Sequence, residues 1–267
     1  NGDGIDDLAI SGYYKGHESS REGSVFIVFG TAEGFDDTLN LEGLHGVAGI
    51  EITARERLND RVGQKVSSAG DINGDGYDDV FIGSDFGNST FVVFGTDSGA
   101  ISVDVDDLDG TNGFELFYSD EDVAGGGDFN GDGFDDLIVG VEEYGAWVLF
   151  GAADMASVVS QLSYTDGYYT SGTLFALDPE YGGDGSLGYR IASGGDEEDE
   201  QALGTSVAVL GDINGDGYDD FILGAYEKEN GSSSDDEGSE EEGGGEEGGG
   251  EEGGGEEGGG EVEGEEG

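Results

Sequence analysis

The chain has 267 residues, and its 64 Asp and Glu against 8 Lys and Arg give a formal net charge of −56. Such a charge repels phosphate, so nucleic acid and anionic membrane surfaces are excluded as partners. The absence of cysteine rules out a disulfide framework. No stretch of about 18 apolar residues predicts a membrane span, and the first residues do not read as a signal peptide.

One acidic phrase recurs along the chain. The chain opens on NGDGIDDLAISG, and fuller copies follow as DINGDGYDDVFIG at 71–83, DFNGDGFDDLIVG at 128–140 and DINGDGYDDFILG at 212–224. Repeated copies with matched flanks do not arise from composition alone. An acidic turn without an ion is the alternative, but its carboxylates would then converge without neutralisation.

The copy at 71–83 indicates what the phrase can bind. Asp71, Asn73, Asp75 and Asp79 stand at positions 1, 3, 5 and 9, and this alternation aims their oxygens at one point. The backbone carbonyl of Tyr77 at position 7 can complete the shell. Ca²⁺ takes about six to eight oxygen ligands and is therefore the predicted occupant. The glycine at position 6 permits the positive φ that so sharp a turn needs.

The residues after each loop distinguish the families of calcium loops. An EF-hand needs Glu at position 12 and then a helix, but position 12 is Ile82, Val139 or Leu223 here. Dockerin-like and thrombospondin-like repeats also want an acidic residue at that place. The runs VFIG, LIVG and FILG are short, β-prone and closed by glycine, so they predict buried strands. Each loop is therefore predicted to be the tip of a β-hairpin.

Further β-prone segments accompany each loop. GSVFIVFG at 23–30, STFVVFG at 89–95 and GAWVLFG at 145–151 share a closing Phe-Gly, and the alignment predicts Trp147 to be a core aromatic. GVAGIEI, GTNGFEL and GSLGYRI follow them, and VGQKVSSAG and LGTSVAVLG precede two of the loops. Four short strands per unit, joined by tight turns, are typical of a propeller blade. The predicted fold is all-β, with blades of four antiparallel strands.

The order LGxSVAxxGDxNGDGxxDxxxG, followed by a VxVFG strand, resembles the FG-GAP repeat of integrin alpha-chain propellers and their bacterial relatives over residues 1–229. The resemblance implies a β-propeller in which the loop between the first two strands of a blade holds Ca²⁺. The ligands that it implies are Asp71, Asn73, Asp75, the Tyr77 carbonyl and Asp79; Asp128, Asn130, Asp132, the Phe134 carbonyl and Asp136; Asp212, Asn214, Asp216, the Tyr218 carbonyl and Asp220. A fourth set, Asn1, Asp3, the Ile5 carbonyl and Asp7, lacks its first ligand.

The repeats are uneven. Residues 151–185 are longer than the corresponding segments of the other repeats, and we expect the additional residues to form an insertion on a blade edge. The segment YSDEDVAGGGD at 118–128 is shorter than its counterparts, so that one first strand looks degenerate. We predict two whole and two partial blades within residues 1–230, as a fragment of a larger propeller, because closure would abolish exposed edges. Residues 231–267 form a tail rich in Gly and Glu that we expect to be disordered.

The predicted function is that of an extracellular or cell-surface, calcium-binding propeller for adhesion to, or recognition of, protein or carbohydrate. In the integrin relatives the partner binds the face opposite the calcium hairpins. That face would include the loop at 12–23 with Lys15, His17 and Arg21, although a merely solvated loop is an equal reading. Tyr164, Tyr168 and Tyr169 are candidates for an aromatic sugar-binding patch.

Two other classes of function stay open. The chain can be the propeller of a polysaccharide-acting or other hydrolytic enzyme, but we expect no catalytic residue, because only His17 and His45 could act as a histidine base and no carboxylate pair stands out. It can also be a structural subunit of a surface assembly or filament, which pairs through exposed blade edges.

Overall fold

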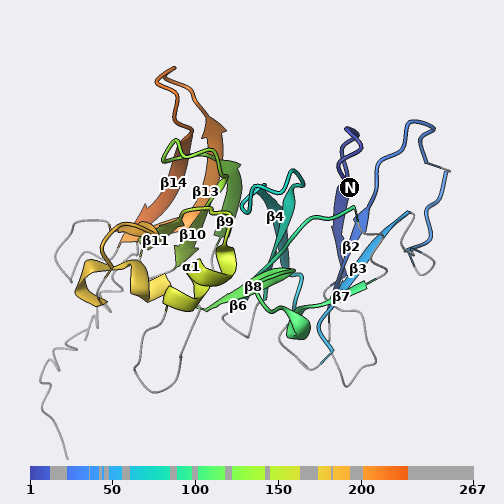
Figure 1. Ribbon diagram of the computed structural model, residues 1–267, viewed down its shortest axis with the longest axis horizontal. Helices are drawn as coiled ribbons and strands as arrows, with labels where there is room; N and C mark the ends of the chain where they lie inside the picture. Colours follow the sequence, from blue (N-terminus) through green and yellow to red (C-terminus); the bar gives the residue numbers. More distant parts are fainter. Residues whose placement is uncertain are drawn as a thin grey trace, which may run out of the picture. The chain divides into compact units, whose positions relative to one another are not determined.

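The structure is a computed structural model and describes residues 1–12, 23–35, 37–41, 44, 48–55, 61–84, 89–97, 102–117, 122–141, 145–162, 174–181, 183–192 and 201–227 (Figure 1). The chain divides into two units, Asn1–Glu229 and Asn230–Gly267, and every described residue belongs to the first. Several predictions fall outside the described residues: the disordered tail, and the roles considered for Lys15, His17, Arg21, His45, Tyr164, Tyr168 and Tyr169.

Two sheets are complete four-stranded meanders in which each strand pairs antiparallel with the next. One consists of β4 (Lys65–Gly70), β5 (Asp79–Gly83), β6 (Ser89–Val93) and β8 (Gly113–Phe117). The other consists of β9 (Asp122–Gly127), β10 (Asp136–Val141), β11 (Gly145–Leu149) and β12 (Gly188–Ile191). These are the two whole blades that the sequence predicts, and in chain order they are the second and the third blade.

The remaining strands form two incomplete blades. β1 (Leu8–Ser11), β2 (Ser24–Val28) and β3 (Gly49–Thr53) pair antiparallel, and β13 (Gln201–Gly211) pairs antiparallel with β14 (Asp220–Glu227). The described part of the chain is therefore a partial β-propeller, as predicted. One strand adds to the predicted antiparallel blades: β7 (Ser102–Asp104), which lies between β6 and β8 in the chain, pairs parallel with β3 at the edge of the first sheet.

The long insertion contributes most of the helical structure. It contains α1 (Met155–Gln161) and the short 3-10 helices Leu174–Leu177 and Pro179–Tyr181, and a third 3-10 helix, Val105–Asp107, follows β7. Asp154 caps α1, because its side chain accepts a hydrogen bond of 3.0 Å from the Ser157 amide. In the described residues no helix is long and apolar enough to cross a membrane.

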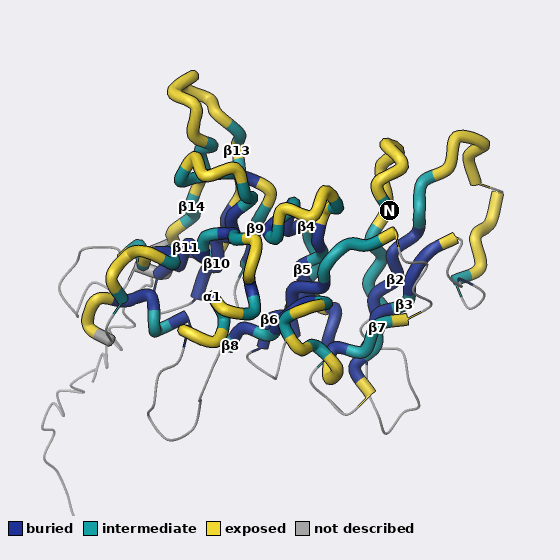
Figure 2. Tube along the Cα trace, viewed as in Figure 1, coloured by how far each residue is buried: buried dark blue, intermediate teal, exposed yellow. Residues whose placement is uncertain are grey.

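The core lies between successive sheets. Its largest cluster joins Phe81 and Leu116 of the second blade to Leu137 and Trp147 of the third, and all four are almost fully buried. Complete burial of side chains of this size is worth about 1.5–3 kcal/mol each. β10 is buried at every position, and after Asp136 it runs as LIVGV without polar alternation, as a strand covered on both faces does. Figure 2 shows this distribution, with buried strands and exposed hairpin tips.

The first strand that looks degenerate in the sequence is fully formed as β9. Its glycines reflect close packing. A Cβ added at Gly125 would lie 2.7 Å from the Cα of Ala69 in the neighbouring blade and 2.7 Å from Leu137 Cδ2. At Gly125, therefore, the backbone of a neighbouring blade occupies the space that a side chain would need, and sheet pairing does not require a side chain there.

Candidate metal centre

Each of the three full acidic loops joins the first two strands of a blade. The loop at 71–79 links β4 to β5, and its side chains at positions 1, 3 and 5 accept hydrogen bonds from the loop's own amides. Asp71 Oδ1 accepts from the Asp75 amide at 2.9 Å, and Asp71 Oδ2 accepts from the Gly76 amide at 2.9 Å. Asp75 Oδ1 in turn accepts from the Tyr77 amide at 3.0 Å. The loop is thus wound around the carboxylate of its first residue.

The same winding recurs in the other two full copies. Asp128 accepts from the Gly131, Asp132 and Gly133 amides, and Asp212 accepts from the Gly215, Asp216 and Gly217 amides. The glycine at position 6 has a φ of 92°, 91° and 93° in the three loops, which is the left-handed region that a side chain would strain. Three unconnected stretches of sequence therefore adopt one conformation.

The aspartate at position 9 has a role that sequence reasoning missed. Asp79 is 1% exposed, and it accepts from the Ile72 amide at 3.1 Å and from the Gly95 amide at 2.8 Å. Asp136, 0% exposed, repeats this with the Phe129 and Gly151 amides at 2.8 and 2.9 Å. Gly95 and Gly151 are the glycines of the closing Phe-Gly pairs, so position 9 ties the loop to the third strand of its blade. In the sequence, the recurring Phe-Gly pair is the feature that could have indicated this contact.

The charges of these buried carboxylates are poorly compensated. Burial raises the pKa of Asp79 to about 8 and that of Asp136 to about 7, although two backbone amides donate to each. Within each loop the carboxylates at positions 1 and 5 raise that pKa further by repulsion. A divalent cation at the loop would supply the missing positive charge, and every candidate donor is an oxygen, as a hard cation such as Ca²⁺ prefers.

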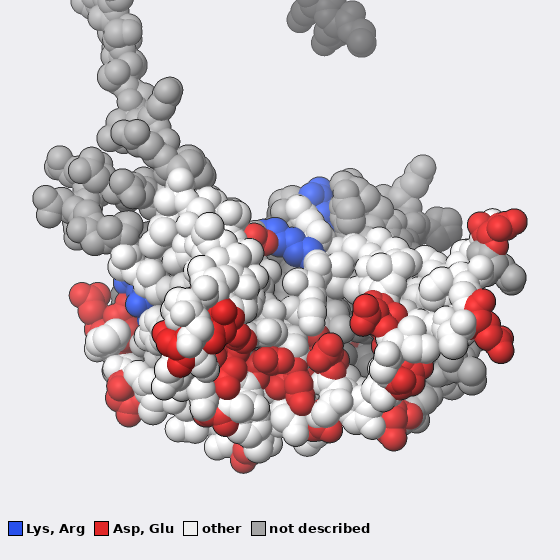
Figure 3. Space-filling model, turned by 90° about the horizontal axis from the view of Figure 1, so that it is seen from above, with Lys and Arg blue, Asp and Glu red and all other residues white. Residues whose placement is uncertain are grey.

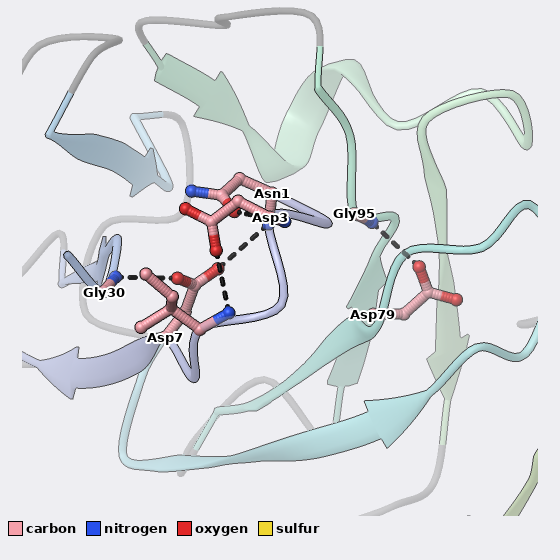
Figure 4. A network of polar contacts seen from close by, with 7 residues as sticks. Asn1, Asp3, Asp7, Gly30, Asp79 and Gly95 are labelled. Carbon is pink, nitrogen blue, oxygen red and sulfur yellow. Dashed lines mark hydrogen bonds and ion pairs between the residues drawn. The ribbon is translucent and has the colours of Figure 1, made fainter. Parts of the chain in front are cut away.

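The opening copy resembles the others only in part. Asn1 Oδ1 accepts from the Asp3 amide at 3.1 Å, Asp3 Oδ1 accepts from the Ile5 amide at 2.8 Å, and Asp7 accepts from the Gly30 amide at 2.8 Å (Figure 4). Its Asp7 also forms an ion pair of 2.9 Å with the terminal ammonium of Asn1.

The carboxylates do not stand in a finished coordination shell. Among the described residues, no three His, Cys, Asp or Glu side chains are grouped as they would be around a metal. The loop amides hold these oxygens instead, yet each oxygen of Asp71 accepts a single N–H and keeps a second lone pair. Every candidate ligand atom in the loops is an oxygen, so the residues fit a hard cation in their chemistry.

The loops belong to a strongly acidic surface. Figure 3 shows Asp and Glu side chains across the face toward which the hairpin tips point in Figure 1, with few Lys or Arg among them. A field of this sign attracts cations and repels anions before any specific contact forms.

Comparison with known proteins adds two findings. The FG-GAP repeat family matches residues 63–104, 121–154 and 203–234, and each matched segment contains one of the three full loops. Integrin alpha-PS3 of Drosophila melanogaster is 30% identical to the chain over 164 residues, which cover 59% of this chain and 14% of that protein. The chain thus spans about a seventh of the length of this relative.

Proposed function

Because this chain is an FG-GAP repeat protein, we propose that it is a calcium-binding propeller module for adhesion or recognition outside the cell. The observation that carries the proposal is the shared winding of three loops whose candidate ligand atoms are all oxygens. In two of these loops the carboxylate at position 9, Asp79 or Asp136, is buried. These loops need positive charge, and among the described residues no Lys or Arg contributes it through the hydrogen bonds and ion pairs of the loop carboxylates.

Each residue of the loop has a distinct part in this proposal. The carboxylates and amide at positions 1, 3 and 5, the carbonyl at position 7 and the carboxylate at position 9 hold the ion. When bound, Ca²⁺ supplies the charge that the carboxylates lack. Position 9 in addition holds the third strand through Gly95 or Gly151, so a bound ion joins three strands of one blade.

The proposed location follows from the affinity for Ca²⁺ that is expected of such loops. Calcium loops of extracellular modules bind with dissociation constants of about 10⁻⁴ to 10⁻³ M, which require the calcium levels found outside cells. The acidic surface suits the same setting, because abundant cations screen it. We therefore place the protein in the extracellular space or at the cell surface.

The proposed partner is a protein, which the similarity to an integrin alpha chain supports, or alternatively a carbohydrate. The role is recognition without catalysis. The chain has two histidines and no cysteine, so the common nucleophile-base pairs are scarce in it. Turnover in a screen against polysaccharides would favour the hydrolase alternative instead. Concentration-dependent growth in light scattering at millimolar calcium would favour self-assembly through blade edges.

Calcium titration by calorimetry tests the metal-binding part of the proposal. We expect saturable binding by the wild type, with a stoichiometry that falls by one when Asp71, Asp128 or Asp212 is changed to Ala. A matched control is Asp109→Ala, which removes an exposed aspartate from a turn outside the loops and leaves the stoichiometry unchanged. If no saturable heat of binding appears at millimolar calcium, the proposal fails.

A further inference from the structure

Neighbouring calcium loops are joined by a pair of hydrogen bonds that ligation by itself does not require. The Asp71 amide donates to Asp135 Oδ2 at 2.7 Å, and the Asp135 amide donates to the Asp71 carbonyl at 3.3 Å. Asp71 is at position 1 of its loop, and Asp135 is at position 8 of the next. We call this reciprocal pair the position-8 clasp.

The clasp repeats one blade further on. The Asp128 amide donates to Asp219 Oδ2 at 3.0 Å, and the Asp219 amide donates to the Asp128 carbonyl at 3.0 Å. Asp219 is again at position 8 of the following loop. The same two bonds thus join loop 71–79 to loop 128–136, and loop 128–136 to loop 212–220.

An aromatic contact accompanies the clasp. The residue at position 7 places its ring against the glycine at position 4 of the preceding loop, and a Cβ added at Gly74 would lie 2.4 Å from the ring of Phe134. The corresponding distance is 2.6 Å from Gly131 to Tyr218 and from Gly2 to Tyr77. Each loop therefore rests on the tip of the next loop in the chain.

The clasp connects the ligands of two ions. Asp135 lies between Phe134 and Asp136, which are both proposed ligands in its own loop. Its partner Asp71 is the first proposed ligand of the preceding loop, and the carboxylate of Asp71 organises that loop through the Asp75 and Gly76 amides. An ion that fixes Phe134 and Asp136 would also fix Asp135, and through the clasp it would fix the main chain of Asp71.

We propose that Asp135 and Asp219 are positioning residues that couple neighbouring calcium loops, so that filling one loop strengthens binding in the loop before it. The inference rests on the proposed calcium binding. Linkage makes the coupling reciprocal, and couplings of this kind change affinity about fivefold or more.

Luminescence of bound Tb³⁺, which replaces Ca²⁺ at oxygen sites, can report on single loops. Tb³⁺ emits when a nearby tyrosine transfers excitation to it, and position 7 is Tyr77, Phe134 or Tyr218 in the three loops. In a Tyr218→Phe background, the signal sensitised by Tyr77 follows loop 71–79. Asp135→Ala should weaken Tb³⁺ binding there about fivefold or more, although Asp135 belongs to another blade.

A charge-matched variant distinguishes the loss of the clasp hydrogen bond from the loss of a negative charge near the ion. Asp135→Asn loses the same negative charge as Asp135→Ala, but it keeps an oxygen that can accept from the Asp71 amide, so it should retain most of the affinity. Asp78 holds position 8 of loop 71–79, and among the described residues its carboxylate accepts no hydrogen bond from another loop. Asp78→Ala and Asp78→Asn should therefore have equal effects on the same signal.

A second loop variant tests the coupling itself. Asp132→Ala removes a ligand from loop 128–136, and it should lower the affinity of loop 71–79 in the wild type but not in Asp135→Ala. Hydrogen exchange of the Asp71 amide without metal gives a readout independent of binding. That amide should be protected in the wild type and in Asp135→Asn, and it should exchange faster in Asp135→Ala.

The two proposals fail in different ways. If the wild type binds neither Ca²⁺ nor Tb³⁺, the proposed function is wrong, while the exchange experiment still decides whether the clasp holds Asp71. If the wild type binds but Asp135→Ala equals Asp135→Asn in both affinity and exchange, the coupling inference is wrong. An unchanged affinity of loop 71–79 in Asp132→Ala would also overturn it.

Discussion

The carboxylate at position 9 has two roles in two of the loops, where it is Asp79 or Asp136. In the second and third blades it is buried and accepts two backbone N–H groups from separate segments, and it also faces the acidic residues of its own loop. Accepting the two backbone N–H groups needs no metal, whereas the repulsion between the neighbouring carboxylates favours a bound cation. A substitution at this position therefore damages the fold even where calcium is absent.

Asp136→Ala should destabilise the metal-free protein by about 2–5 kcal/mol, because it leaves the buried amides of Phe129 and Gly151 without an acceptor. Asp132→Ala, in the same loop but exposed, should cost less than about 1 kcal/mol. Urea denaturation in excess EDTA measures both. Equal losses for the two variants would show that Asp136 acts only as a ligand.

The insertion holds the clearest ion pair. Arg190 Nη1 donates to Asp178 Oδ2 at 2.6 Å, and the guanidinium lies 5.5 Å from the ring centroid of Trp147. Although burial opposes the change, the hydrogen bonds from Arg190 and from the Glu180 amide lower the pKa of Asp178 below its ordinary value of 3.8. The pair should anchor the insertion on the outer strands of its blade.

This lowered pKa predicts a dependence of stability on pH. A carboxylate whose pKa is lower in the folded state contributes its full stability above the unfolded value and loses it as the pH falls through the folded value. The wild type should therefore exceed Asp178→Asn in unfolding free energy at neutral pH, and the difference should shrink below about pH 4. Denaturation curves between neutral and acid pH test this, and a constant difference would contradict it.

At the scale of the element, local patterns in the sequence predicted more than long-range packing did. The hairpins around each loop, the strands closed by Phe-Gly and the burial of Trp147 were predictable, because turn residues and apolar runs act over a few residues. The parallel strand β7 was not, because it pairs across blades. The sequence suggested that strand β9 is degenerate, because the reason for its Gly125 is close packing against Ala69 of a neighbouring blade.

The helix α1 and the clasp differ in how far the sequence indicates them. Asp154 precedes Ser157 by three residues, and Met155, Val158 and Leu162 recur at helical spacing on a buried face, so the signal for α1 was present. The aspartate at position 8 is as regular in the sequence as the ligands are. Its partner is 64 residues away, however, and only the packing of adjacent blades reveals that partner.

At the scale of the molecule, each sheet depends on the next one for its burial. Ile72 and Ile138 are both 0% exposed between described blades, whereas their counterparts on the last sheet, Ile213 and Ile222, are 70% and 55% exposed. Leu210, at 44% exposed, is the counterpart of the fully buried Ala69. Within the described residues, one face of the β13–β14 sheet therefore lacks the cover that the other blades receive.

This contrast predicts unequal effects of one substitution at equivalent sites. Ile138→Ala should cost about 2–5 kcal/mol, because it opens a cavity between two packed sheets. Ile222→Ala should cost less than about 1 kcal/mol, because the side chain is already largely in water. Equilibrium unfolding of the two variants is the measurement. A large loss for Ile222→Ala would mean that another part of the protein covers this face.

The central claim is that calcium at the hairpin loops holds the blades together, and thermal unfolding with and without chelator tests it most directly. With about 10 mM calcium and dissociation constants of about 10⁻⁴ to 10⁻³ M, each occupied loop should add about 1.4–2.7 kcal/mol. Three loops together should raise the midpoint by about 10 °C or more over the same protein in excess EDTA. A midpoint that is the same in calcium and in EDTA would contradict the claim.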